Sequence, residues 1–275
     1  PELRFSYFAE LADLVLQAAR RHDLVVLIEQ TNGDRAAELA LLRSPRISMM
    51  DGLLFSPLGM SHEDAGLIAA DYPLVLLGER VFSDDYDHVT IQNVDAARDA
   101  TAFLLDGGRK RIALLGAHEG EVVGSAAFRY AGYREALAAA GVPLDPSLVI
   151  ASQGWHRTDG ATAMRVALER GARFDGLFAL NDELALGALR VLQAAGLRVP
   201  EDVAVVGFDN LDEGQYAMPS LTTVDPGRPA IAQAAVDSLV ERIAAGVPES
   251  GAGRRIEAPY RLIVRESADF ARVSA

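Results

Sequence analysis

Short, continuously apolar runs recur along this chain, and amphipathic segments separate them. The runs cover residues 24–30, 51–57, 73–79, 111–117, 148–152, 175–181 and 203–209. A strand with one face in water alternates apolar and polar residues, whereas a strand covered on both faces by helices is apolar throughout. The repeated pattern therefore predicts an α/β protein built on parallel sheets, in two successive α/β sets.

The predicted helices between these runs end on ordinary stop signals. We expect helices over 34–43, 61–70, 126–141, 181–196 and 230–245. The segments 126–141 and 181–196 both finish on a glycine, and Pro143 or Pro200 follows a few residues later. Glycine readily adopts the left-handed conformation that closes a helix, and proline cannot continue one. The same helix-to-strand connection is therefore used twice.

The C-terminal part interrupts this alternation. Residues 254–267 follow the last long helix and a Gly/Ser-rich turn, and they predict two short strands separated by Pro259. Late elements of this kind often return to complete an earlier sheet. Candidate crossings between two domains lie in the polar segments near 91–95, 222–228 and 255–260.

Composition and charge exclude several classes of function. The chain has 26 Lys and Arg against 39 Asp and Glu, and its net charge of −13 opposes a nucleic-acid-binding surface spread over the whole chain. It has no cysteine, and its five histidines show no metal-ligand spacing. The only lysine, Lys110, lies in no phosphate-binding motif. We therefore expect no catalytic residues, no metal, no cofactor and no enzymatic activity.

Two of the apolar runs end in polar turns that carry carboxylates. Asn181 and Asp182 follow one run, and Asp209 and Asn210 follow another. Ligands of open parallel sheets bind outside the carboxyl ends of the strands, and a carboxylate can accept hydrogen bonds from two sugar hydroxyls at once. Helix capping is the alternative at the first turn, because Asn and Asp are favoured N-caps. We favour capping over ligand contact for Asn181 and leave both roles open for Asp182.

Trp155 is the only tryptophan and lies in a polar segment just past a predicted strand. A large aromatic ring in such a loop is suited to stacking on the apolar face of a sugar or a base. Packing of the ring onto the core is an equally open alternative.

Six further segments form a specific set when their order and spacing are taken together. They are YFAEL (7–11), DGLLFSP (51–57), FRYAGYREAL (128–137), NDELALGALRVLQAAGLRVPEDVAVVGFDN (181–210), PSLTTV (219–224) and LIVRES (262–267). The set resembles the effector-binding region of the LacI/GalR family of bacterial transcriptional regulators, over nearly the whole chain. The block at 181–210 alone also resembles periplasmic sugar-binding proteins of the same fold.

The resemblance implies a periplasmic-binding-protein-like fold of type I. Two doubly wound parallel-sheet subdomains would be joined by three crossovers, with a small ligand in the interdomain cleft. The expected subdomains are 1–91 plus 228–256 and 92–227 plus 257–275. The family also has an N-terminal helix-turn-helix headpiece that reads operator DNA, and a strand immediately before the position of residue 1; this sequence contains neither.

The resemblance also assigns candidate ligand-binding residues. Asp209 matches the acid that binds sugar hydroxyls, and we favour that role over a turn role. Arg129 matches the effector-binding arginine, whose planar fork binds carboxylates or paired hydroxyls; its alternative is a salt bridge on a helix surface. Ser125 matches a ligand-cleft position. At Gly78 other members carry an acid, so their sugar preference does not transfer.

The aromatic pair Tyr7 and Phe8 resembles the pair at the start of the family's first helix. Packing along the helix face is the alternative for at least one of these two residues.

The function implied is the effector-sensing domain of a cytoplasmic regulator of repressor type, which binds a sugar or a related small polar metabolite. We expect a homodimer that contacts operator DNA only through the headpiece and does not contact a membrane. The alternative is an extracytoplasmic sugar receptor that feeds a transporter, since its cleft would look the same.

Overall fold

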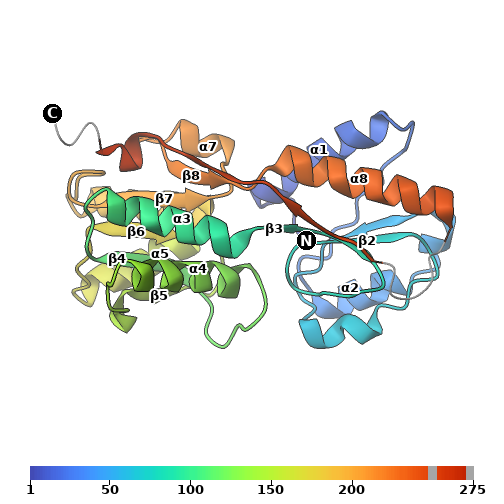
Figure 1. Ribbon diagram of the computed structural model, residues 1–275, viewed down its shortest axis with the longest axis horizontal. Coiled ribbons are helices and arrows are strands. Elements are labelled where there is room, and N and C mark those ends of the chain that lie inside the picture. Colours follow the sequence, from blue (N-terminus) through green and yellow to red (C-terminus); the bar gives the residue numbers. More distant parts are fainter. Residues whose placement is uncertain (247–252, 271–275) are drawn as a thin grey trace. The chain divides into compact units, whose positions relative to one another are not determined.

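Two sheets organise the chain, one in each of two units (Figure 1). The computed structural model describes residues 1–246 and 253–270. Unit 1 comprises Pro1–Ile91, Val123–Ser125 and Gly227–Pro259, and unit 2 comprises Gln92–Val122, Ala126–Pro226 and Tyr260–Ala275. Each unit is therefore assembled from pieces that are distant in sequence.

The sheet of unit 1 has four parallel strands in the order β1-β2-β3-β9. They are β1 (Leu53–Phe55), β2 (Leu74–Leu77), β3 (Asp87–Ile91) and β9 (Arg255–Ala258). Successive side chains of β2 belong to opposite cores, Val75 and Leu77 to one, Leu74 and Leu76 to the other. Both faces of β2 are buried, which explains its continuously apolar sequence.

Helices α1 (Ser6–Arg20) and α8 (Arg228–Ala245) pack against each other and supply much of the first of these cores. The second core is completed by α2 (Arg35–Leu42). The 3₁₀ helices η1 (Ile47–Met49) and η2 (His62–Leu67) follow α2 in the chain. The helix expected over 61–70 is thus a short 3₁₀ helix. A capping box of Ser61 and Asp64 begins it, and Gly66 in its last turn disfavours continuation.

The strand expected over 24–30 is absent. These residues form no ladder with any described strand, and Val25 and Leu27 expose 88% and 69% of their surface. A strand is stabilised by hydrogen bonds to a neighbouring strand, so an apolar pattern without a pairing partner does not make one. The prediction from the pattern was wrong here.

The sheet of unit 2 has six strands in the order β10-β8-β7-β6-β4-β5. They are β4 (Ile112–Ala117), β5 (Val149–Ala151), β6 (Gly176–Ala179), β7 (Ala204–Phe208), β8 (Thr222–Asp225) and β10 (Arg261–Ile263). All neighbours pair in parallel except β10, which runs antiparallel to β8 at the edge. The parallel sheets predicted from the apolar runs are confirmed.

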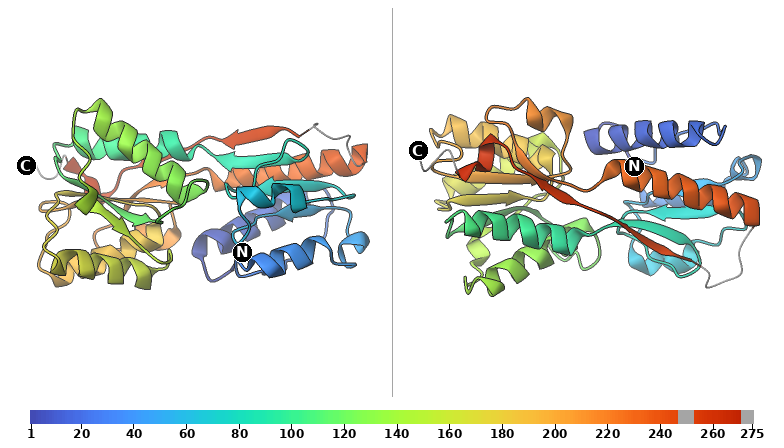
Figure 2. Two further views of the ribbon diagram at one scale, coloured as in Figure 1. Left: turned by 90° about the horizontal axis from the view of Figure 1, so that it is seen from below. Right: turned by 45° about the horizontal axis from the view of Figure 1, so that its top comes forward.

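Helices cover both faces of this sheet (Figure 2). On one face lie α3 (Asn93–Asp106) and α4 (Ser125–Ala139), and on the other α5 (Arg157–Glu169) and α6 (Asp182–Ala194). The short elements are α7 (Asp212–Gln215), η3 (Pro146–Leu148) and η4 (Glu266–Ala268). Helices α5 and α6 approach closely at Gly160 and Gly187, where a Cβ atom would overlap the backbone of the facing helix.

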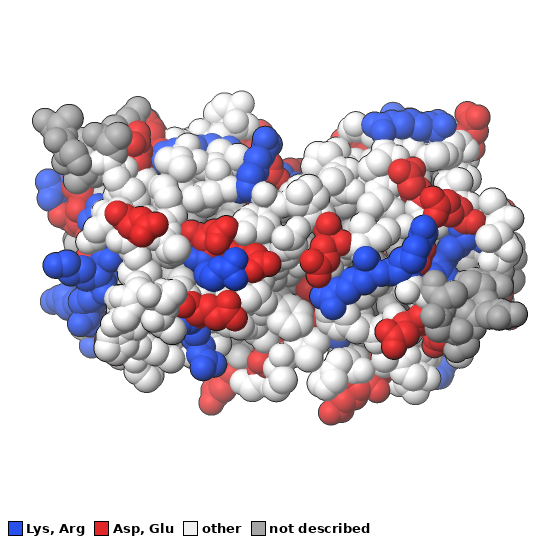
Figure 3. Space-filling view, viewed as in Figure 1, with Lys and Arg blue, Asp and Glu red and all other residues white. Residues whose placement is uncertain are grey.

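The surface carries side chains of both charges. On the face drawn in Figure 3, acidic and basic side chains are interspersed across its middle. Within residues 1–246 and 253–270, every helix is too short or too polar to cross a bilayer.

Candidate functional site

The turn after β7 places Asp209 at the carboxyl end of the sheet of unit 2. Asp209 and Asn210 have φ angles of 116° and 52°, which non-glycine residues rarely adopt. Such conformations cost about 1 to 2 kcal/mol per residue, so the surrounding contacts must hold them. The backbone N–H of Asp209 donates to the Val224 carbonyl at 2.8 Å, and the residue is only 6% exposed. The backbone of Asp209 is therefore held at the end of the sheet, and its side chain is buried there.

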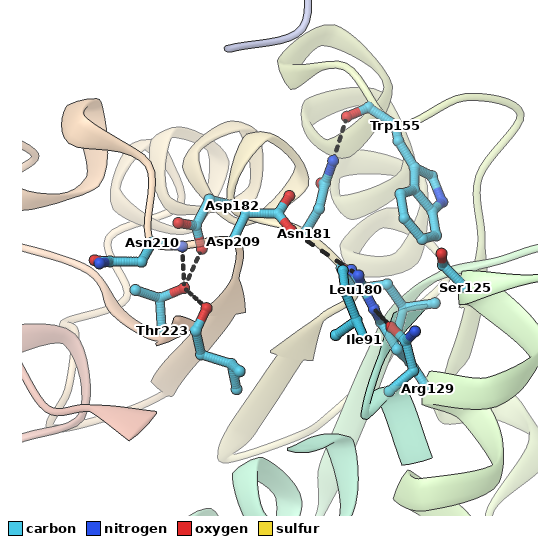
Figure 4. Close-up of polar contacts among 12 residues, drawn as sticks. Ile91, Ser125, Arg129, Trp155, Leu180, Asn181, Asp182, Asp209, Asn210 and Thr223 are labelled. Atoms are coloured by element: carbon cyan, nitrogen blue, oxygen red, sulfur yellow. Dashed lines mark hydrogen bonds and ion pairs between the residues drawn. The ribbon is translucent and has the colours of Figure 1, made fainter. Parts of the chain in front are cut away.

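Arg129 on α4 lies beside that carboxylate (Figure 4). Its Nη2 is 3.9 Å from Asp209 Oδ1, its Nε donates to Asn93 Oδ1 at 2.7 Å, and its Nη1 donates to the Leu180 carbonyl. The guanidinium carbon lies 3.5 Å from the centre of the Phe208 ring. Arg129 is 3% exposed, so it is buried in unit 2 and is not a surface residue of its helix.

Trp155 also lies beside this arginine, with its ring centre 5.5 Å from the guanidinium carbon. The indole N–H donates to the Gly116 carbonyl at 3.0 Å, and the Trp155 carbonyl accepts from Asn181 Nδ2 at 3.1 Å. Asn181 Oδ1 accepts from the Leu184 N–H at 2.8 Å, so Asn181 caps α6. The side-chain amide of Asn181 thus links the N-cap of α6 to the backbone of Trp155.

Asp182 is directed into the protein. It is fully buried, its Oδ2 accepts from the Leu211 N–H at 2.8 Å, and its Oδ1 accepts from Thr223 Oγ1 at 2.6 Å (Figure 4). A Cβ at position 207 would lie 2.1 Å from Asp182 Oδ1, which explains the glycine there. These bonds join the start of α6 to the turn that carries Asp209.

The remaining predicted residues lie in unit 1. The rings of Tyr7 and Phe8 on α1 meet edge to face at 5.2 Å. Ser125 Oγ donates to Glu79 Oε2 at 2.8 Å, and Glu79 Oε1 accepts from the Ile91 N–H at 3.0 Å. The structure thus brings Arg129, Asp209, Trp155 and Asn181 together within unit 2, and it places Tyr7, Phe8 and Ser125 in unit 1.

Three residues of these networks were missed by sequence reasoning. Asn93 orients Arg129, Thr223 supports the turn of Asp209, and Glu79, which is 5% exposed, holds Ser125. Glu79 ends the apolar run 73–79, so the strand-end argument that selected Asp209 could have selected it as well. Asn93 and Thr223 carry no comparable signal.

The arrangement suits the binding of a neutral polar molecule. A carboxylate accepts hydrogen bonds, a guanidinium donates them, and an indole offers an apolar face. In the part of the chain that the structure describes, no group of three or more His, Asp or Glu side chains could hold a metal ion.

Known proteins resemble this chain in sequence and in structure. The family of periplasmic binding protein-like domains matches residues 101–268. The HTH-type transcriptional regulator CelR of Thermobifida fusca is 37% identical over 227 residues, which cover 79% of this chain and 63% of CelR. The chain therefore matches less than two thirds of the length of this curated relative.

Solved structures extend the similarity to nearly the whole chain. A LacI-family transcriptional regulator from Sanguibacter keddieii superposes with a TM-score of 0.90 at 52% identity, over 98% of this chain and 97% of that one. A complex of the transcriptional regulator CelR with cellobiose gives a TM-score of 0.83 at 30% identity, over 95% of this chain and 79% of that one. These relatives are regulators and not enzymes.

Proposed function

This chain belongs to the LacI/GalR family of bacterial transcriptional regulators, and we propose that it is the region that senses a small effector, a sugar or a related polar metabolite. The arrangement of Asp209, Arg129 and Trp155 at the carboxyl end of one sheet carries the proposal. Strand ends of open α/β sheets are where such folds bind ligands.

The spacing of the two charged groups supports a hydroxyl ligand. Arg129 Nη2 and Asp209 Oδ1 are 3.9 Å apart, too far for a hydrogen bond to each other. A hydroxyl oxygen about 2.8 Å from both atoms would accept from the guanidinium and donate to the carboxylate. A ligand that lacks this hydroxyl would leave a desolvated acid without its donor, at a cost of about 1 to 3 kcal/mol.

The other predicted residues receive supporting roles in this proposal. Trp155 would stack on the apolar face of the sugar, and Tyr7, Phe8 and Ser125 are further candidates for contact with the ligand. Asp182 would hold the turn of Asp209, since its carboxylate already accepts two hydrogen bonds inside the protein.

We extend the proposal to the whole regulator. In this proposal the subdomains are 1–91 plus 228–256 and 92–227 plus 257–275. Two copies form a cytoplasmic homodimer that contacts operator DNA through a helix-turn-helix headpiece, and the chain has no catalytic activity of its own. The relatives described above support a regulator and lend no support to a transport receptor.

Isothermal titration calorimetry tests the effector proposal. A panel of cellobiose, monosaccharides, nucleosides and phosphosugars should include at least one member that binds. Asp209→Asn should weaken that binding by about tenfold or more, because a hydrogen bond to a charged group contributes about 1.5 to 3 kcal/mol. Asp212→Asn, the same change at an exposed position three residues away, is the matched control and should bind as the wild type does.

Two results would refute the proposal. One is a folded wild-type protein that gives no heat with any member of the panel. The other is equal affinity of the wild type and Asp209→Asn for the sugar that binds.

A further inference from the structure

We propose that Arg265 is a positioning residue for effector binding, because it holds the turn after β7 in the conformation that presents Asp209. Arg265 lies in the segment between β10 and η4 and is far from Asp209 in sequence. The inference rests on the proposed function in one respect, since it takes Asp209 as the residue that binds the effector.

The turn at Asp209 and Asn210 needs contacts from other parts of the chain to keep its conformation. Asp209 and Asn210 both have positive φ, whereas Leu211 returns to an extended conformation at φ −65° and ψ 146°. Neither Asp209 nor Asn210 is a glycine, so each favours other conformations when its contacts are removed. A relaxed turn would move the Asp209 carboxylate away from Arg129.

Arg265 binds the turn through two nitrogens of its planar guanidinium. Its Nη2 donates to Asn210 Oδ1 at 2.7 Å, and its Nη1 donates to the Leu221 carbonyl at 2.8 Å. The two ends of one guanidinium therefore join the side chain of the strained residue to the segment just before β8. Lysine has one ammonium group and cannot reproduce this geometry.

The backbone of Arg265 is itself fixed to β8. Its N–H donates to Thr222 Oγ1 at 2.8 Å, and its carbonyl accepts from the same hydroxyl at 2.8 Å. The neighbouring Ser267 Oγ accepts from the Thr222 N–H at 2.8 Å and donates to the Val205 carbonyl at 2.6 Å. The side chain of Arg265 thus extends to the turn from a backbone that is bonded to β8.

Asp182 binds the same turn as a hydrogen-bond acceptor, whereas Arg265 binds it as a donor. Its carboxylate binds the Leu211 N–H and the Thr223 hydroxyl, and Thr223 Oγ1 also accepts from the Asn210 N–H at 3.2 Å. Asp182 is fully buried, so its replacement would disturb folding. Arg265 is partly exposed and is the cleaner position for an experiment.

The first measurement needs no ligand. Hydrogen–deuterium exchange of the peptide that spans residues 204–216 should be faster in Arg265→Ala than in the wild type, and Arg265→Lys should fall between them. Arg261→Ala is the matched control, since Arg261 is an exposed arginine on β10 that binds Asp225 and does not touch the turn. Equal exchange of this peptide in Arg265→Ala and the wild type would overturn the inference.

The second measurement uses a double-mutant cycle with Asn210→Gly and the sugar that gives heat in the panel, with cellobiose tried first. Arg265→Ala should lose about tenfold in affinity, which matches the cost of one strained residue. Glycine takes positive φ freely and lacks the Oδ1 that Arg265 binds, so the same arginine change in the Asn210→Gly background should cost less than about threefold. A purely structural role would give the same loss in both backgrounds and would refute the proposal.

The two proposals can fail separately. If Arg265→Ala loosens the turn but no sugar binds the wild type, the hold on the turn stands and the effector proposal fails. If a sugar binds the wild type and Arg265→Ala equally well, the positioning role fails and the effector proposal stands.

Discussion

Burial shifts the pKa values of two neighbouring residues at the start of β3, Asp87 and His88, in opposite directions. Burial alone raises the pKa of Asp87, but hydrogen bonds from Arg242 and Arg254 outweigh it and hold that pKa well below its ordinary value of 3.8. For His88, burial outweighs the Gly78 carbonyl and lowers the pKa of the imidazole below its ordinary value of 6.5. In the folded protein at neutral pH, Asp87 is therefore an anion and His88 is a neutral ring.

We predict that the free energy of unfolding decreases as the pH falls below 6.5. Unfolded His88 takes up a proton near its ordinary pKa, whereas folded His88 does so only at a lower pH, so acid favours unfolding in the window between the two values. The slope contributed by this residue is at most about 1.4 kcal/mol per pH unit. Urea unfolding at about pH 7 and about pH 5.5 measures it.

His88→Gln removes this contribution and should flatten the pH dependence. His62→Gln, at an exposed position, is the control and should retain the dependence of the wild type. Identical slopes in the wild type and His88→Gln would contradict the prediction.

At the residue scale, sequence reasoning could select the strand-end acids but could not separate their roles. Asp182 and Asp209 both follow apolar runs and look equivalent in the sequence. They differ because the close approach of Gly207 lets the Asp182 carboxylate point inward, and because positive φ turns Asp209 toward Arg129. Both causes depend on tertiary contacts that no local pattern contains.

At the scale of elements, the contact between α5 and α6 depends on two glycines. A Cβ at Gly187 would lie 2.1 Å from the Arg157 carbonyl oxygen, and one at Gly160 would lie 2.4 Å from the Leu184 carbonyl oxygen. These partners are backbone atoms and cannot rotate away. The helices can lie this close together only because both positions lack a side chain.

We therefore predict that Gly187→Ala destabilises the protein by about 1 to 3 kcal/mol or more. Helix propensity alone predicts the opposite sign, since alanine in a helix is favoured over glycine by about 1 kcal/mol. Urea unfolding decides between the two effects. Gly66→Ala is the control, because a Cβ there meets no atom within 4 Å, and it should change stability by less than about 0.5 kcal/mol.

The strands that sequence reasoning missed share a physical cause. No strand was predicted at β8, which lies in the candidate crossing 222–228; Thr222 and Thr223 are polar, yet both are fully buried with bonded hydroxyls. The chain passes from unit 2 to unit 1 at Pro226 and Gly227, within that segment. In β3 the polar residues Asp87, His88 and Thr90 are likewise buried. A search for apolar runs finds strands that bury hydrocarbon, and it does not find strands whose buried polar groups are paired.

Two motifs that are distant in the sequence meet in the sheet of unit 2. In PSLTTV the Ser220 N–H and hydroxyl both donate to Glu266 Oε2 at 3.0 Å, and the Thr222 N–H donates to Ser267 Oγ of LIVRES. The family resemblance relied on both motifs. Their hydrogen bonds explain why those residue types belong together.

At the scale of the whole molecule, we predict a homodimer. A regulator that reads two half-sites of an operator needs two headpieces, and symmetric pairing of the sensing regions supplies them. Sedimentation equilibrium at micromolar concentration should give twice the monomer mass. A monomer that persists across the concentration series would contradict this expectation.

The interleaved assembly of the two units has a consequence for synthesis of the protein on the ribosome. In the sheet of unit 1, β3 at residues 87–91 pairs with β9 at residues 255–258, and in unit 2 β8 pairs with β10 at residues 261–263. Neither sheet can be completed until residues 255–263 have been translated. A shorter nascent chain therefore exposes the unpaired edges of β3 and β8, and unpaired strand edges favour association with other chains.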